Sequence, residues 1–185
     1  MAPPQQWPDP DTVLYLTANE LCCDVAPPED ADMDMPQVTT PPPTIPLSIQ
    51  LITVPTHPVV NSYGLFAAGV IPPNTLVCNY IGRVHLQTTY PDSDYAVTYF
   101  GSYAIDATLA GNEARFINDY RNIGSRPNVA FDTYKDCYGG IQVGVWTLNM
   151  PIARGEEILG NYGRAFWRAR GMRGVLGPDW DDAWD

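Results

Sequence analysis

The stretch YAIDATLAGNEARFINDYRNIGSRPNV, residues 103–129, decides the fold of this chain. Two other segments belong with it: SYGLFAAGVIPPNTLVCNYIG at residues 62–82 and ARGEEILGNYG at residues 153–163. Each short piece is weak evidence alone, since Gly-Leu-Phe-Ala is a plain turn in most proteins and Gly-Glu-Glu-Ile is usually a surface turn before a strand. The order and the separation of the three segments are therefore what carries the argument.

The sequence around these segments is typical of many brief strands. From Leu47 onward, β-branched and aromatic runs alternate with Gly, Pro and Asn turn signals. The best strand candidates are residues 75–81, 95–100, 103–106, 128–134 and 141–148. One late helix is expected at Arg164–Arg170, ended by Gly171. The pattern predicts a mainly β domain with short helices and, by itself, says nothing about function.

The first 46 residues differ in composition from the rest. Thirteen of the nineteen prolines lie in the first sixty residues, which favours extended backbone over packed structure. Within this region Leu14, Ala18 and Leu21 have helical spacing, so a short helix is expected at 11–23. The predicted organisation is an acidic, Pro-rich tail or linker at 1–46, a domain at 47–166 and a C-terminal segment with an acidic end at 167–185.

The net charge of −11 is unevenly distributed. No Lys or Arg occurs before Arg83, and residues 1–46 hold eight acidic groups, whereas the stretch 47–178 is close to neutral. This balance argues against nucleic acid as a direct ligand, because phosphate binding needs a positive stripe. A basic protein partner fits the charge better. The alternative is that the acidic ends only keep a neutral domain in solution.

The four cysteines, Cys22, Cys23, Cys78 and Cys137, form no CxxC pair. Neither a metal site nor a disulfide framework is therefore expected, and a reducing compartment is the default. The N-terminus lacks a charged start followed by an apolar run, and no eighteen consecutive residues are apolar. We expect an intracellular protein, nuclear or cytoplasmic, without membrane contact; nothing in the sequence indicates its oligomeric state.

The three segments together resemble the SET-domain protein lysine methyltransferases over roughly 110 residues. That family has Gly-Leu-Phe-Ala first, then Ile-Asp-Ala followed by Gly-Asn-x-Ala-Arg-Phe-Ile-Asn, and last Gly-Glu-Glu-Leu followed by Tyr-Gly. The resemblance implies a SET-domain (β-clip) fold of small curved sheets with a C-terminal pseudoknot, a kind of threading that is rare in proteins. The pseudoknot would bring Asn118 and Tyr162 to one site.

The resemblance also implies the cofactor S-adenosylmethionine and the residues that hold it. Ser62, Tyr63 and Gly64 match the turn whose backbone approaches the cofactor, which glycine permits because it has no side chain. Asn118 matches a side-chain ligand, and Asp119 is expected to act through its main chain. The remaining candidates are the pocket residues Tyr95 and Tyr162, and Trp167 with Phe166, whose rings would stack on the adenine or, alternatively, pack on the core.

The reaction implied is methyl transfer to a lysine side chain of a protein. Alignment of the amine with the methyl group is the main task, and such positioning supplies roughly 7–11 kcal/mol. The amine must also be neutral although a free lysine has a pKa of about 10.4, so a dry aromatic channel is useful. Tyr162 matches the catalytic tyrosine, Tyr95 is a second catalytic candidate, and Tyr95 and Trp146 are candidates for the channel wall.

The sequence departs from the family where Asn-His-Ser-Cys is replaced by Asn118-Asp119-Tyr120-Arg121. No cysteine cluster follows Gly163, so the zinc-bound lid of many relatives cannot form and another segment, within 166–184, must close the site. The expected substrate is a histone, which places the protein in chromatin. Two alternatives stay open: methylation of a non-histone protein, and a SET-like binding or scaffold module that has lost turnover.

Overall fold

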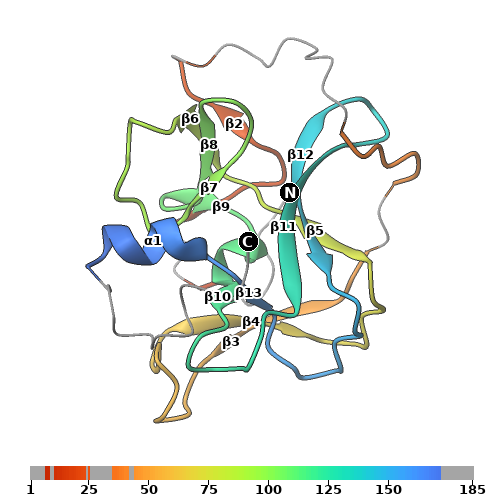
Figure 1. The fold of residues 1–185 in the computed structure, drawn as a ribbon, viewed down its shortest axis with the longest axis vertical. Helices are drawn as coiled ribbons and strands as arrows, with labels where there is room; N and C mark the ends of the chain where they lie inside the picture. The colour runs from red at the N-terminus through yellow and green to blue at the C-terminus, as the bar shows by residue number, and fades with distance from the viewer. Residues whose placement is uncertain (1–6, 9–10, 24, 26–34, 42–43, 172–185) are drawn as a thin grey trace.

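The computed structural model describes residues 7–8, 11–23, 25, 35–41 and 44–171 of the chain (Figure 1). These residues form short strands in several small sheets, one 3-10 helix and one α-helix. The mainly β fold class expected from the sequence is therefore confirmed.

The longest strands build a three-stranded antiparallel sheet of β11 (Val129–Lys135), β12 (Ile141–Thr147) and β5 (Leu76–Asn79). The β11–β12 hairpin turns at Asp136, whose Oδ1 accepts the backbone N–H groups of residues 138 and 140. Gly139 has a φ of 85°, a left-handed conformation that suits glycine at this turn. Valine, isoleucine and aromatic side chains, which fit a pleated surface, supply most of the buried positions of this sheet.

A second sheet has the order β2–β6–β8–β7. Its strands are β2 (Glu20–Leu21), β6 (Arg83–Leu86), β8 (Tyr103–Asp106) and β7 (Ala96–Thr98). The β6–β8 and β7–β8 pairs are antiparallel, whereas β2 joins β6 in parallel. In Figure 1 this sheet lies on the opposite side of the molecule from β11, β12 and β5.

An antiparallel hairpin, β3 (Leu47–Leu51) with β4 (Tyr63–Ala67), forms the lower edge of the view in Figure 1. Its loop, residues 52–62, leads directly into β4, so Tyr63 and Gly64, which the sequence placed in a turn, are strand residues paired with Leu51 and Gln50. The 3-10 helix η1 (Glu113–Phe116) packs beside β4 and is followed at once by β10 (Asn118–Asp119).

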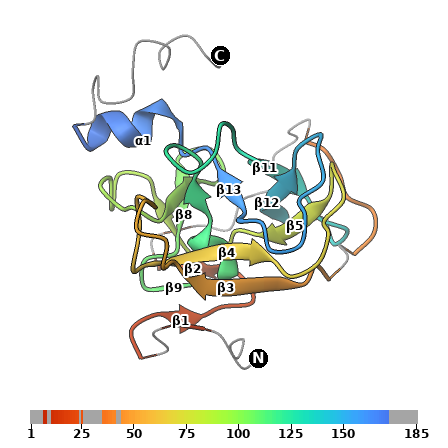
Figure 2. The same ribbon diagram turned by 90° about the horizontal axis from the view of Figure 1, so that it is seen from below.

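The centre of the fold is a parallel pair of two short strands, β10 and β13 (Leu159–Gly160). Asn118 pairs with Leu159 and Asp119 with Gly160. The helix α1 (Gly163–Ala169) starts directly after this pair and lies at the edge of the molecule in both views (Figures 1 and 2). The middle and the C-terminal sequence motifs are thus joined side by side.

The five strands expected from 75–81, 95–100, 103–106, 128–134 and 141–148 all form, with bounds that differ by a few residues. The expected helix at Arg164–Arg170 also forms as α1. These segments have strong local signals: β-branched runs in the strands, and for the helix a stop at Gly171, whose φ is 73°.

The short helix expected at 11–23 does not form. The residues make two strands instead, β1 (Leu14–Tyr15), parallel to β9 (Ala110–Gly111), and β2, parallel to β6. Long-range backbone pairing therefore outcompetes the local helical spacing. The region 1–46 is also more than a tail, because the side chains of Trp7, Val13 and Val25 are buried in the main hydrophobic core.

Candidate active site

The two distant motifs meet at Tyr162. Its hydroxyl donates a hydrogen bond of 2.7 Å to the carbonyl of Ile117, the residue before Asn118. Its backbone N–H donates to Oδ2 of Asp119 at 2.8 Å. Tyr162 is therefore fixed against the Ile117–Asp119 segment through both its main chain and its side chain.

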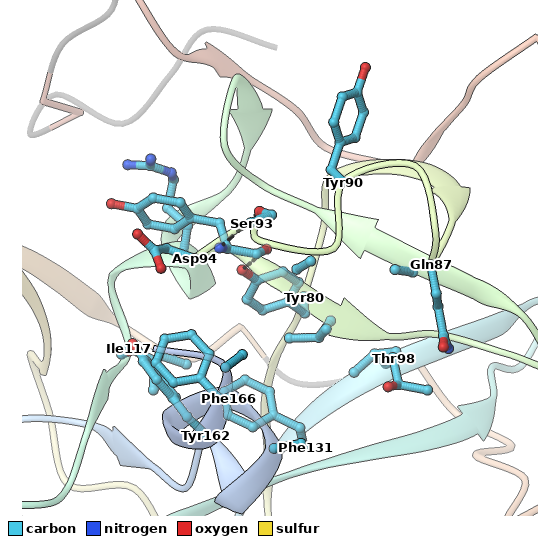
Figure 3. A pocket seen from close by; sticks show the side chains of 18 of the residues that line it. Tyr80, Gln87, Tyr90, Ser93, Asp94, Thr98, Ile117, Phe131, Tyr162 and Phe166 are labelled. Carbon is cyan, nitrogen blue, oxygen red and sulfur yellow. Dashed lines mark hydrogen bonds between the residues drawn. The ribbon is translucent and has the colours of Figure 1, made fainter. Parts of the chain in front are cut away.

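A cavity of 510 Å³ opens beside this junction. Figure 3 shows Tyr162, Phe166 and Phe131 at one end of it, Tyr80 in the middle, and Gln87 and Thr98 toward the other end. Ring contacts join these aromatic side chains in pairs: Tyr162 lies 4.7 Å from Phe166, and Tyr80 lies 6.0 Å from Phe131, both edge to face. The cavity has an aromatic wall suited to an apolar chain that carries an amine.

The Tyr162 phenol stays protonated at neutral pH. Burial, together with the charge of Asp119, raises its pKa well above the ordinary value of 10.0. The hydroxyl is thus a hydrogen-bond donor and not a base. Burial raises the pKa of Tyr80 in the same way, and the Tyr80 hydroxyl donates to the backbone carbonyl of Tyr95 at 2.7 Å.

Tyr95, the second candidate from the sequence, also lines the cavity. The guanidinium of Arg115 lies 4.4 Å from the centre of its ring, a cation–π contact that occupies one aromatic face. The Tyr95 backbone is held by Ser93, whose Oγ accepts its N–H at 3.2 Å. Only the other face of the ring is available to a ligand cation.

The segment Ser62–Gly64, at the start of β4, lies next to Asn118. The Asn118 side chain donates Nδ2–H bonds to Oε1 of Glu157 at 2.8 Å and to the carbonyl of Tyr63 at 3.3 Å. Both partners can only accept, so the amide nitrogen must face them and the Asn118 Oδ1 turns the other way. Tyr63 is 37% exposed, which leaves the start of β4 open to a ligand.

These residues fit S-adenosylmethionine. The Asn118 Oδ1 accepts no hydrogen bond from the residues that the structure describes, so it can accept one from the ammonium of the cofactor. Gly64 is buried against Glu157, and a Cβ there would lie 2.7 Å from Oε1 of Glu157. Any residue other than glycine at position 64 would therefore require Glu157 to shift.

Asp119 is not a side-chain ligand for a cofactor, because its carboxylate is already engaged. Arg121 Nη1 donates to Oδ1 at 3.0 Å and to Oδ2 at 2.8 Å, and the indole N–H of Trp167 reaches Oδ2 at 3.3 Å. With the bond from Tyr162, the carboxylate ties together the central strands and α1. The role that the sequence suggested for Asp119, through its main chain, is compatible with this arrangement.

The helix α1 covers one side of the cavity. Ala165, Phe166, Ala169 and Arg170 line it. Arg170 fixes the helix end to the loop before β7, because it pairs with Asp94 and donates to the carbonyls of residues 92 and 93. Its guanidinium also lies 3.6 Å from the centre of the Phe166 ring. These side-chain contacts hold the cover against the loop before β7.

The two tryptophans expected at the site do not line this cavity. Trp146, on β12, packs edge to face on Tyr134 with ring centres 5.5 Å apart. Trp167 stacks nearly parallel to Tyr162, with an interplanar angle of 16° and ring centres 6.3 Å apart. Trp167 is thus next to Tyr162 without lining the cavity, whereas Trp146 belongs to the packing of the large sheet.

Sequence reasoning missed several residues of the site: Tyr80, Phe131, Arg115, Arg170, Glu157 and His57. Phe131 and Tyr80 were inside expected strands and gave no signal beyond strand propensity. Glu157 was visible only as part of a turn motif.

The residues that the structure describes contain no group of three or more His, Cys, Asp or Glu side chains arranged to hold a metal ion. None of the helices they form has the length and the apolar character needed to cross a membrane.

The family model of the SET domain matches residues 62–163. The match covers more than half of the chain, so this protein belongs to the SET-domain family. The comparison with curated proteins gave no match.

The fold is similar to solved structures of Polycomb Repressive Complex 2 from Chaetomium thermophilum. A humanized mutant bound to an inhibitor has a TM-score of 0.53 at 21% identity, over 67% of this chain and 16% of that chain. An autoinhibited form bound to S-adenosylmethionine has a TM-score of 0.54 at 19% identity, over 72% and 17%. An apo form with substitutions in Ezh2 has 0.54 at 20%, over 71% and 16%.

At identities of 19–21%, the similarity to these structures shows a shared fold. The chain spans about a sixth of the length of those chains, as the covered shares of 16–17% show.

Proposed function

We propose that this protein transfers a methyl group from S-adenosylmethionine to a lysine side chain of a protein, with a histone as the preferred substrate. The observation that carries the proposal is the junction at Tyr162. The protonated phenol of Tyr162 donates to the carbonyl of Ile117, the neighbour of Asn118, and this contact lies beside an aromatic cavity of 510 Å³.

The cofactor would be held on the side of this junction that faces the start of β4. The residues proposed for it are Ser62, Tyr63 and Gly64 through their backbone, Asn118 through Oδ1, Asp119 through its main chain, and Tyr95, Tyr162 and Trp167 through their rings or hydroxyls.

When bound, the cofactor would supply a sulfonium methyl group as the electrophile for the lysine amine, with the neutral thioether as the leaving group. The protein's own part is to orient a neutral amine. Tyr162 directs the amine by hydrogen bonding and takes no proton, since its phenol remains protonated. The aromatic wall of Tyr80, Phe131 and Phe166 disfavours the charged ammonium, whose proton is lost to water before transfer.

A basic protein substrate suits the charge of −11. A histone tail is the proposed example, with residence in the nucleus, and a basic non-histone protein would fit the same argument. Steering of the substrate by the acidic N-terminal region would raise its local concentration without direct contact to the reacting atoms.

The test is methyl transfer from labelled cofactor to a mixed histone preparation, read by mass spectrometry. Tyr162→Phe should lower the rate by roughly 100-fold, because the amine loses its orienting hydroxyl. The variant should stay folded, with a melting temperature lower by about 2–4 °C for one lost buried hydrogen bond. Full activity in Tyr162→Phe would disprove the role of the hydroxyl.

A protein that binds the cofactor but modifies no protein in a whole extract would support the scaffold alternative instead. The changed Asn118–Arg121 segment motivates that alternative, yet its side chains form ordered contacts with Tyr162 and α1.

A further inference from the structure

We infer that His57 and Glu157 are positioning residues that orient Asn118 for the cofactor. This inference rests on the proposed function and adds two side chains to it, neither of which touches the reacting atoms. Both come from segments far from Asn118 in the sequence, the loop between β3 and β4 and the turn before β13.

Glu157 is buried between three groups. Its Oε1 accepts the Asn118 Nδ2–H at 2.8 Å, its Oε2 lies 3.1 Å from Nε2 of His57, and Gly64 packs directly on it. The Glu157 side chain is only 10% exposed, and buried polar groups are as a rule hydrogen-bonded. Each oxygen therefore has its own donor, and the carboxylate has one defined orientation.

His57 is able to act as that donor. Its Nδ1 accepts the backbone N–H of Val59 at 3.3 Å, so the ring proton is on Nε2, which faces Glu157. The side chain is 9% exposed. This tautomer donates to Oε2 of the carboxylate, whereas Asn118 donates to Oε1, so His57 fixes Glu157 from the other oxygen.

The consequence for Asn118 follows from its hydrogen bonds. Glu157 and the Tyr63 carbonyl hold the amide nitrogen, so the only polar atom that can turn toward a ligand is Oδ1. Without Glu157 the amide would rotate about its χ2 angle and present a donor or an acceptor to the ligand. A cofactor ammonium needs the acceptor, and one hydrogen bond to a charged group contributes about tenfold or more in affinity.

The neighbouring Glu156 has a different task. Its Oε2 accepts the backbone N–H of Ala153 at 2.7 Å and closes an exposed turn. Glu156→Gln is therefore a matched control for Glu157→Gln: the same chemical change one residue away, without contact to Asn118.

The experiment is calorimetric titration of the full chain with S-adenosylmethionine, for the wild type, Glu157→Gln, Glu156→Gln, His57→Ala and His57→Gln. Glu157→Gln and His57→Ala should weaken binding by about tenfold, the worth of one misplaced hydrogen bond to a charged group. Glu156→Gln should stay within twofold of the wild type. His57→Gln, which keeps an N–H donor, should recover most of the loss. In turnover assays the KM for the cofactor should rise while the KM for the protein substrate stays within twofold.

Thermal unfolding of each variant shows whether a loss of binding is a loss of folding. Equal weakening by Glu156→Gln and Glu157→Gln, or no rescue by His57→Gln, would overturn the inference while leaving cofactor binding intact. A wild-type chain that binds no cofactor would overturn the proposed function and this inference together. The two failures are therefore distinguishable.

Discussion

Asp119 replaces the histidine that the related motif has after its asparagine. Its carboxylate accepts hydrogen bonds from Arg121, from the backbone of Tyr162 and from the indole of Trp167. The Asp119–Arg121 pair is buried, with side chains 5% and 10% exposed. The substitution thus supplies a new network where the family pattern is broken, and it links the tyrosine to the helix that covers the cavity.

The tyrosines around the cavity make stability sensitive to alkaline pH. Burial raises the folded-state pKa of Tyr80 and of Tyr162, so the folded protein keeps these protons to a higher pH than the unfolded chain, which loses them near pH 10. Their contribution to stability is complete below pH 10 and is lost as the pH rises further. Urea unfolding from pH 8 to 11 should show a falling free energy of unfolding above pH 10.

Tyr80→Phe isolates one of these groups. The variant should lose about 1 kcal/mol at pH 8, because the hydrogen bond to the Tyr95 carbonyl is removed, and its stability should fall less steeply above pH 10. An equally steep fall in the wild type and in Tyr80→Phe would show that this phenol does not titrate as described.

At the scale of elements, the described part of the N-terminal region, residues 7–8, 11–23 and 25, packs on the domain; we call it the N-terminal strap. Trp7 is 7% exposed, donates its indole N–H to the carbonyl of Val13 at 2.9 Å, and packs on Tyr15 and Phe116. Phe116 in turn contacts Tyr63 at the segment proposed for the cofactor. The strap therefore supports η1 and, through it, the candidate site.

Trp7→Ala should lower the free energy of unfolding by about 3 kcal/mol, since it empties a packed aromatic position. Leu14→Ala, at an exposed position of the same strap, is the control and should cost less than about 1 kcal/mol. Chemical denaturation gives both values. If Trp7→Ala were no more harmful than Leu14→Ala, residues 7–25 would be a tail and not part of the core.

The sequence predicted most elements of the domain but not those that depend on distant partners. The strands at 128–134 and 141–148 have strong β-branched patterns and pair with each other through a short hairpin, so local signals were sufficient. The strands β1 and β2 are two residues each and exist only because β9 and β6 offer free edges. Nothing in the sequence of residues 11–23 shows that pairing.

The same distinction applies to the site. The resemblance to the SET-domain family predicted that Asn118 and Tyr162 belong together, and the pairing of β10 with β13 gives that proximity. The contact of His57 with Glu157 joins residues a hundred positions apart and belongs to no recognised motif, so it could be found only in the folded chain.

At the scale of the whole molecule, most of the acidic residues lie in segments of the sequence other than those that line the cavity. The acidic groups of the chain concentrate in its first 46 residues and its last seven, while the residues lining the cavity include Arg115, Arg170 and Asp94. Attraction of a basic substrate would therefore come from the ends of the chain, and selection of the lysine from the aromatic cavity.

Neutralising Glu29, Asp30, Asp32 and Asp34 together tests whether the acidic N-terminal region attracts the substrate. These four residues lie outside the part of the chain that the structure describes. The KM for a histone substrate should rise at low salt and become less dependent on salt, because long-range attraction is screened over about 10 Å at 0.1 M. Point changes are preferable to removal of residues 1–46, which would also remove Trp7 and Val13 from the core. An unchanged salt dependence would exclude steering by these acids.

The central claim is that Asn118 and Tyr162 flank one cofactor site. Calorimetric titration of S-adenosylmethionine into the wild type and Asn118→Ala tests it most directly. We predict micromolar binding to the wild type and a loss of at least about tenfold in Asn118→Ala, the cost of one hydrogen bond to a charged group. No binding to the wild type at millimolar cofactor, or equal affinity in the two proteins, would contradict the account.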